Sequence, residues 1–263
     1  MSQATELSIQ EDLEVILYSV SDHIATITLN RPERLNAFIP EMRVAYLASL
    51  KKANLDPDVR VIVVTGAGRA FTSGADFRSL HNTNPTTFAA SYADDAVPLD
   101  YAMELEKPLI AAINGAVAGV GIAHALMADI RFASEDAFFT TSFSRLGLTA
   151  ELGIAWLLER LVGTANALDL LYTSRRVSSS EAKAMGLVQR VVPAARLLDE
   201  VYAFARQIVD ETSAYSLGVL RGQVYRSWAQ DWRAAYQESE KFVLEQFGRS
   251  EFAERARART ARA

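Results

Sequence analysis

Apolar runs separated by short polar breaks fill the first third of the chain. Two β-branched runs, LEVILYSV (13–20) and HIATITLN (23–30), flank the dipeptide SD and predict a β-hairpin. An amphipathic helix is predicted over EMRVAYLASLKKANLD, because Pro40 just before it favours a first helical turn. The run VRVIVVTGAG (59–68) is mostly apolar and ends in glycines, which is typical of a strand buried on both faces.

The middle of the chain repeats this pattern. KPLIAAINGAVAG (107–119) predicts another buried strand that enters a glycine turn, and VGIAHALMAD (120–129) predicts a helix of small residues. IRFASEDAFFTT (130–141) predicts two short strands. Further along, Ser178 with Glu181 three residues later predicts a helix that begins with a capping box.

After LVQRVVP (187–193), which predicts a last strand, only helices are expected. We therefore divide the chain into a mixed α/β core domain, residues 1–193, and a C-terminal helical region, residues 194–263. One face of the predicted helix over DWRAAYQESEKFVLEQF carries an apolar stripe, which is interpreted as packing within the chain or against another subunit. The stripe consists of Trp232, Tyr236, Val243 and Phe247.

Composition narrows the function classes. The chain has 263 residues and a formal charge of −5, so no general electrostatic attraction to nucleic acid is expected. Cysteine is absent, which excludes disulfides and thiolate catalysis, and the three histidines have no metal-site spacing, so no metal is expected. Neither a signal peptide nor an apolar run long enough to span a membrane is found, and a cytoplasmic protein without membrane contact is predicted.

Two glycine turns offer candidate chemistry. RAFTSGADF (69–77) and INGAVAGVG (113–121) each follow a predicted buried strand, and the second turn opens a helix. Backbone N–H groups at such turns have no partner in the sheet, so two of them together can stabilise a developing negative charge. Each turn alone is most simply structural, because turns often need glycine.

Four segments, in this order and spacing, resemble the enoyl-CoA hydratase/isomerase (crotonase) superfamily. They are LNRPERLNAF (29–38), VIVVTGAGRAFTSGADF (61–77), KPLIAAINGAVAGVGIAHALMADIRFAS (107–134) and SSSEAKAMGLVQRVVP (178–193). The resemblance implies an α/β spiral of ββα units with a C-terminal helical region that builds homotrimers, often hexamers. It also implies an acyl-CoA thioester substrate, with coenzyme A as part of the substrate and no other cofactor.

The resemblance assigns roles to particular residues. The two oxyanion N–H groups fall on Ala75 and on Val120, which stands where glycine is usual in the family. The backbone that contacts the adenine falls on Ser73, Ala75 and Phe77, and the loop that lines the CoA arm contributes Arg34, Leu35 and Ala37.

The sequence departs from the hydratases of this superfamily. Their two catalytic glutamates fall on Ala123 and on Phe143, so efficient hydration is not expected. Glu151 stands where the similar peroxisomal Δ3,Δ2-enoyl-CoA isomerases carry their single catalytic glutamate, although Leu152 replaces the glycine that usually follows. A single carboxylate in an apolar pocket, with a raised pKa, suits allylic isomerisation.

Other interpretations stay open at this point. Thr149-Ala150-Glu151 is also a typical helix start, with a capping hydroxyl and an acid in the first turn. His124 is most simply structural, but in the pocket it, or Glu151, could direct water in a hydrolase of an acyl-CoA or a cyclic β-diketone. A non-catalytic acyl-CoA-binding protein is the third possibility. Asp76 and Asp129 are predicted to cap or to pair structurally.

Overall fold

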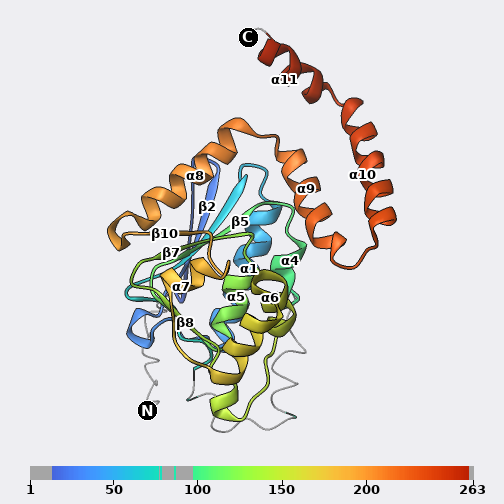
Figure 1. Ribbon diagram of the computed structural model, residues 1–263. Coiled ribbons are helices and arrows are strands. Elements are labelled where there is room, and N and C mark those ends of the chain that lie inside the picture. Colours follow the sequence, from blue (N-terminus) through green and yellow to red (C-terminus); the bar gives the residue numbers. More distant parts are fainter. Residues whose placement is uncertain (1–13, 77, 79–85, 87–96, 261–263) are drawn as a thin grey trace, which may run out of the picture.

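The computed structural model describes residues 14–76, 78, 86 and 97–260. A six-stranded sheet, in the order β1-β2-β3-β5-β7-β10, forms its centre (Figure 1). The first pair is the predicted antiparallel hairpin, and the other neighbours are parallel. The strands are β1 (Ile16–Ser21), β2 (Ile24–Leu29), β3 (Val61–Gly66), β5 (Leu109–Ile113), β7 (Ile130–Ser134) and β10 (Arg190–Val192).

The strands of a second sheet, in the order β4-β6-β8-β9, alternate along the chain with those of the first. Three times in succession a strand of the large sheet leads into one of the small sheet: β3 into β4, β5 into β6, and β7 into β8. This repetition is the spiral that the resemblance implied. The small sheet consists of β4 (Ala70–Thr72), β6 (Ala116–Ala118), β8 (Phe138–Thr140) and β9 (Val177–Ser178).

The central strands β3 and β5 of the large sheet are buried on both faces, as their apolar runs predicted. Helix α1 (Pro40–Leu55) lies over one face and α8 (Leu197–Glu211) over the other. Alternate side chains of β3 point to opposite faces of the sheet. Val61 and Val63 pack with α8, whereas Ile62 belongs to the cluster that contains α1. Each such side chain contributes about 1.5–3 kcal/mol by leaving water.

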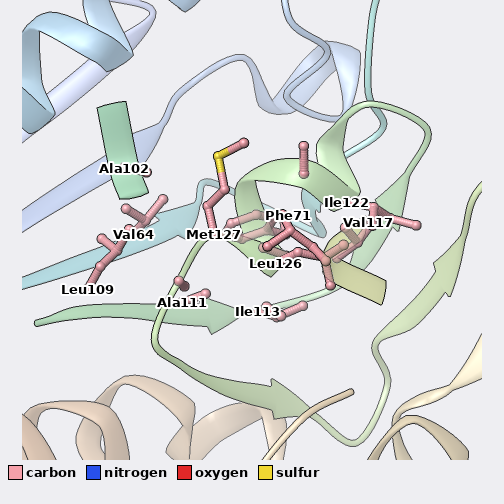
Figure 2. Packing of buried hydrophobic residues seen from close by; sticks show 14 of the residues in the cluster. Val64, Phe71, Ala102, Leu109, Ala111, Ile113, Val117, Ile122, Leu126 and Met127 are labelled. Atoms are coloured by element: carbon pink, nitrogen blue, oxygen red, sulfur yellow. The ribbon is translucent and has the colours of Figure 1, made fainter. Parts of the chain in front are cut away.

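Two helices follow the strand pairs and carry the candidate chemistry. Helix α5 (Gly121–Leu126) comes after β6, and α6 (Ile154–Thr173) comes after β8 and the short 3-10 turn η2 (Ser144–Leu146). Figure 2 shows side chains of α5 packed with those of strands β3 to β6. All six residues of α5 are buried, so its position relative to both sheets is fixed by packing.

The capping box predicted at residue 178 is only half formed. The Ser178 hydroxyl accepts a hydrogen bond from the Glu181 N–H at 3.2 Å, at the start of α7 (Ser179–Ala184). The Glu181 carboxylate does not return to Ser178, because it pairs with Arg175 at 2.6 Å. Arg175 also contacts Asp169 at 2.6 Å, so the side chain that would close the box serves an ion-pair network.

From residue 194 on, the described chain is helical apart from its connecting turns, as predicted: η3 (Ala194–Arg196), α8, α9 (Ala214–Ser227), α10 (Trp232–Phe247) and α11 (Ser250–Thr260). Helices α10 and α11 lie away from the sheets (Figure 1). The apolar stripe is therefore exposed in the single chain, with Trp232 82% and Phe247 60% accessible. Nowhere in the described chain is a helix both long and apolar enough to cross a bilayer.

One buried arginine joins α9 to the core. Arg221 pairs with Asp129 at 3.0 Å, and its other nitrogens donate to the carbonyl oxygens of Ala102, Met103 and Leu105. The first two carbonyls belong to the short helix α4 (Tyr101–Glu104). The predicted structural pairing of Asp129 is confirmed, and Asp76 likewise pairs with an arginine, at 3.3 Å.

Candidate active site

The two glycine turns lie directly against each other. A Cβ atom on Gly74, which has φ +92°, would lie 2.6 Å from the Ala118 carbonyl oxygen and 3.4 Å from the Val120 nitrogen. A Cβ atom on Gly121 would lie 2.5 Å from the Thr72 side chain. A side chain at either position would collide with the other turn. Glycine at positions 74 and 121 therefore allows the two turns to pack this closely.

This contact places the two predicted oxyanion donors side by side. Ala75 forms a parallel β-bridge with Phe38. In this bridge the Phe38 N–H donates to the Gly74 carbonyl oxygen, and the Asp76 N–H donates to the Phe38 carbonyl oxygen, so the peptide groups on both sides of Ala75 are used and its own N–H is not. The Ala75 N–H therefore points the other way, and neither it nor the Val120 N–H donates to any described residue. Val120 is the residue just before α5, where the helix dipole favours negative charge. Two unpaired donors at one place fit an oxyanion hole.

The loop that was predicted to line the CoA arm lies beside the first turn. The Ser73 N–H donates to the Leu35 carbonyl oxygen at 2.9 Å, and the Ser73 hydroxyl lies 3.5 Å from the Arg34 carbonyl oxygen. The 3-10 turn η1 (Pro32–Arg34) shapes this loop, and Ala37 is buried at its end. Five of the six predicted CoA-binding residues are thus brought together, while Phe77 lies outside the described residues.

Asn36 is a positioning residue that the sequence did not reveal. Its side chain is fully buried, and its amide donates to the carbonyl oxygens of Ala67 and Ala70 at 2.9 and 2.7 Å. Its carbonyl oxygen accepts from the Arg31 N–H. Asn36 has φ +54°, which asparagine tolerates better than most residues, so an asparagine inside a polar loop was the available signal.

Glu151 lies in the loop before α6, not in the helix. The helix begins at Ile154 after Gly153, and no side chain caps its first turn. The predicted helix start at Thr149-Ala150-Glu151 is therefore wrong. The chain instead passes through two consecutive left-handed residues, Leu152 with φ +48° and Gly153 with φ +69°, and this turn separates the carboxylate from the helix.

The carboxylate of Glu151 is half-buried and unpaired. Among the described residues none donates a hydrogen bond to it, and none forms an ion pair with it. Burial raises the pKa of the carboxyl group, because desolvation disfavours its charged form. The flanking residues Ala150 and Leu152 pack on the main core cluster, which includes α5. The group is therefore free to accept a proton beside an apolar surface.

The family model of the enoyl-CoA hydratase/isomerase family matches residues 19–259, nearly the whole chain. The chain belongs to the enoyl-CoA hydratase/isomerase family. It is 43% identical over 195 residues to a probable enoyl-CoA hydratase of Mycobacterium bovis, covering 70% of this chain and 68% of the relative. A 1,2-epoxyphenylacetyl-CoA isomerase of Escherichia coli is 36% identical over 214 residues, covering 80% and 81%.

A solved family structure confirms the crotonase fold. The enoyl-CoA hydratase of Bacillus anthracis superimposes with a TM-score of 0.89 at 26% identity, covering 95% of this chain and 97% of the other. A closer likeness to the peroxisomal isomerases stays a prediction.

Buried apolar side chains occupy the two positions where family hydratases were expected to carry glutamates. Ala123 is completely buried within α5, and Phe143 is 5% exposed and packs in the same core cluster. Neither side chain can hold a water molecule or transfer a proton. In this family member, Glu151 is the only carboxylate at any of the three expected catalytic positions.

His124 of α5 lies in an aromatic cluster with Tyr46 of α1 and with Phe38 of the loop before α1. Its ring stacks on Phe38, with centroids 4.3 Å apart, and meets the edge of Tyr46 at 5.0 Å. Burial lowers the pKa of His124 to about 4, so the imidazole is neutral near pH 7. The His124 ring therefore has a structural role, because it stacks on Phe38, the residue that forms the β-bridge with Ala75. The accessory role in directing water stays a prediction.

Proposed function

We propose that this protein isomerises enoyl-CoA thioesters, moving a double bond from the Δ3 to the Δ2 position with Glu151 as the only acid–base group. The supporting observation is the unpaired, half-buried Glu151 carboxylate, combined with buried apolar residues at the hydratase positions. The family contains both hydratases and isomerases, and one relative carries an isomerase name, which is consistent with this choice.

The reaction needs one carboxylate and one oxyanion hole. Ionised Glu151 removes a proton from C2 of a 3-enoyl thioester, and the electrons of that C–H bond pass into the carbonyl, giving a dienolate. The N–H groups of Ala75 and Val120 stabilise the negative oxygen. Protonated Glu151 then returns the proton to C4, which leaves the conjugated 2-enoyl product. The raised pKa makes the carboxylate a stronger base toward a weak carbon acid.

Coenzyme A enters this proposal as part of the substrate, and no further cofactor is needed, because no redox change occurs. We assign Arg34, Leu35, Ala37 and Ser73 to the surface that contacts the CoA arm, although their own N–H groups already donate to carbonyl oxygens, those of Arg34, Leu35 and Ala37 within the loop and that of Ser73 to Leu35. Their close association with the oxyanion turn supports this assignment, since the thioester must reach Ala75 while its nucleotide remains outside.

Isomerisation can be tested with 3-hexenoyl-CoA. We expect the conjugated 2-hexenoyl-CoA to form, with solvent deuterium appearing in part at C4 in D2O. Replacing Glu151→Gln keeps the size of the side chain and removes its basicity, so kcat falls by about 10²–10⁴-fold. Glu159→Gln, at an exposed glutamate on α6, is the matched control and keeps the wild-type rate.

Two results would refute this mechanism. Unchanged kcat in Glu151→Gln would show that another group moves the proton. Formation of 3-hydroxyhexanoyl-CoA as the main product, or of free CoA, would indicate hydration or hydrolysis.

We further propose that the chain forms homotrimers or hexamers through its C-terminal helices. The support is the apolar surface of α10, where Trp232, Leu244 and Phe247 are each at least 60% exposed in the single chain. Such a surface is typical of an interaction site.

A further inference from the structure

A cavity of about 500 Å³ lies beside the loop that carries Glu151. Leu152 and Gly153, which follow the glutamate directly, form one side of it. Helix α4 contributes Met103, the end of α5 contributes Met127, and the first turn of α6 contributes Trp156. The cavity therefore lies where three helices meet next to the proposed base.

The size and lining of the cavity suit an apolar group larger than a short acyl chain. Pockets of roughly 300–1,000 Å³ hold whole drug-sized ligands. Met127 is 3% exposed and is the residue directly after α5. Figure 2 shows its side chain among the buried apolar residues of the core. Methionine sulfur makes favourable contacts with aromatic rings, and two methionines line this one cavity.

Trp156 gives the cavity an aromatic wall with a fixed orientation. The Arg160 guanidinium lies 3.7 Å from the centre of its ring, and Trp228 of the segment after α9 meets it at 4.9 Å in an edge-on arrangement. A ring held in this way can receive a second ring in a stacked or edge-on geometry.

Charge limits the ligand further. Asp100, the residue before α4, lines the cavity, and its carboxylate makes no hydrogen bond to the described residues. No basic side chain of the described chain lines the cavity. The exposed Asp100 carboxylate would therefore repel an anionic acyl group, and no basic side chain in the lining offsets this repulsion.

Leu152 places an apolar side chain at a backbone conformation that disfavours it. A leucine at φ +48° is uncommon, and glycine adopts this conformation without strain. The leucine packs on the core and lines the cavity next to Glu151 in the chain.

From these observations we propose that the cavity is the acyl pocket of this enzyme and that it selects an uncharged acyl group bearing an aromatic ring. This proposal rests on the proposed function in one respect, namely that the ligand is an acyl-CoA thioester. The ring lies between Trp156 and the two methionines, and Leu152 separates it from the carboxylate.

Binding measured without turnover tests the pocket separately from the chemistry. Glu151→Gln protein is titrated calorimetrically with phenylacetyl-CoA, butyryl-CoA and succinyl-CoA. We expect phenylacetyl-CoA to bind about tenfold more tightly than butyryl-CoA, which is about 1.4 kcal/mol. Succinyl-CoA, with the same chain length as butyryl-CoA, binds most weakly because of Asp100.

Two variants in the same background assign the preference to this cavity. Trp156→Ala removes the aromatic wall, and Met103→Phe fills the space without removing core atoms. Both are expected to abolish the advantage of phenylacetyl-CoA while butyryl-CoA binding stays within about twofold, a small effect on the scale of binding energies. Tyr172→Ala, at a 73% exposed aromatic residue of α6, is the control and retains the preference.

The outcomes separate the two proposals. Equal affinities for phenylacetyl-CoA and butyryl-CoA, or a preference that survives both variants, would overturn the pocket assignment whatever the enzyme does to 3-hexenoyl-CoA. A clear preference lost in both variants supports the pocket, even if 3-hexenoyl-CoA is not isomerised and the proposed reaction fails.

Discussion

Replacing His124→Phe should make the protein less sensitive to acid. The imidazole is buried between Phe38 and Tyr46, and its pKa falls from an ordinary value of 6.5 to about 4. In the unfolded chain the same group binds a proton readily below pH 6.5. Its contribution to stability is therefore complete above about 6.5 and is lost as the pH falls toward 4.

The size of this effect follows from the two pKa values. A difference of about 2.5 corresponds to roughly 3 kcal/mol of stability lost once the pH is below both values. At about pH 5 the loss is roughly 2 kcal/mol, because the unfolded chain is almost fully protonated there and the folded protein is not. Phenylalanine keeps an aromatic ring in the stack and cannot be protonated.

Urea unfolding followed by tryptophan fluorescence provides the measurement. Wild type, His124→Phe and the control His23→Asn, which alters an exposed histidine, are compared at about pH 7 and pH 5 at one protein concentration. The drop in unfolding free energy between the two pH values should be roughly 2 kcal/mol smaller for His124→Phe than for the other two. An equal drop in all three proteins would refute the argument.

Four further outcomes are expected. Glu151→Gln should be more stable than wild type at about pH 7 and equal to it near pH 4, by urea unfolding, because the raised pKa of the carboxyl group penalises only its ionised form. Gly74→Ala should lower kcat by about 10²–10³-fold by separating the two oxyanion donors, and an unchanged kcat would contradict that geometry. Leu152→Gly should be about 1 kcal/mol more stable than Leu152→Ala, reversing the usual order, because the backbone there is left-handed. Trp232→Glu combined with Phe247→Glu should yield smaller assemblies in sedimentation velocity, and unchanged sedimentation would exclude α10 from the interface.

Local patterns predicted those elements whose residues decide their own conformation. The β3 run VIVV is apolar at every position because both sheet faces are covered, and Pro40 begins α1 as its fixed φ requires. The two glycine turns could also be located, since their glycines stand directly after buried strands. That the turns touch each other depends on the small sheet pairing β4 with β6, which no single segment encodes.

The features that sequence reasoning missed depend on distant partners or on rare backbone conformations. Thr149 and Glu151 make a typical helix start, but the left-handed pair Leu152-Gly153 moves the N-cap of α6 four residues on, to Gly153. Asn36 bonds to carbonyl groups more than thirty residues away, so its role is invisible in its own loop. The Glu181 carboxylate was assigned to a cap and instead binds Arg175.

Arg221 links the C-terminal helix α9 to the cavity proposed as the acyl pocket. Its guanidinium holds the carbonyl groups of Ala102 and Met103, and the Met103 side chain of the same short helix lines the cavity beside the loop of Glu151. A shift of α9 therefore moves one wall of that cavity. In the proposed oligomer, assembly would fix the position of α9, and the acyl groups that fit the proposed pocket would then depend on assembly as well as on the single chain.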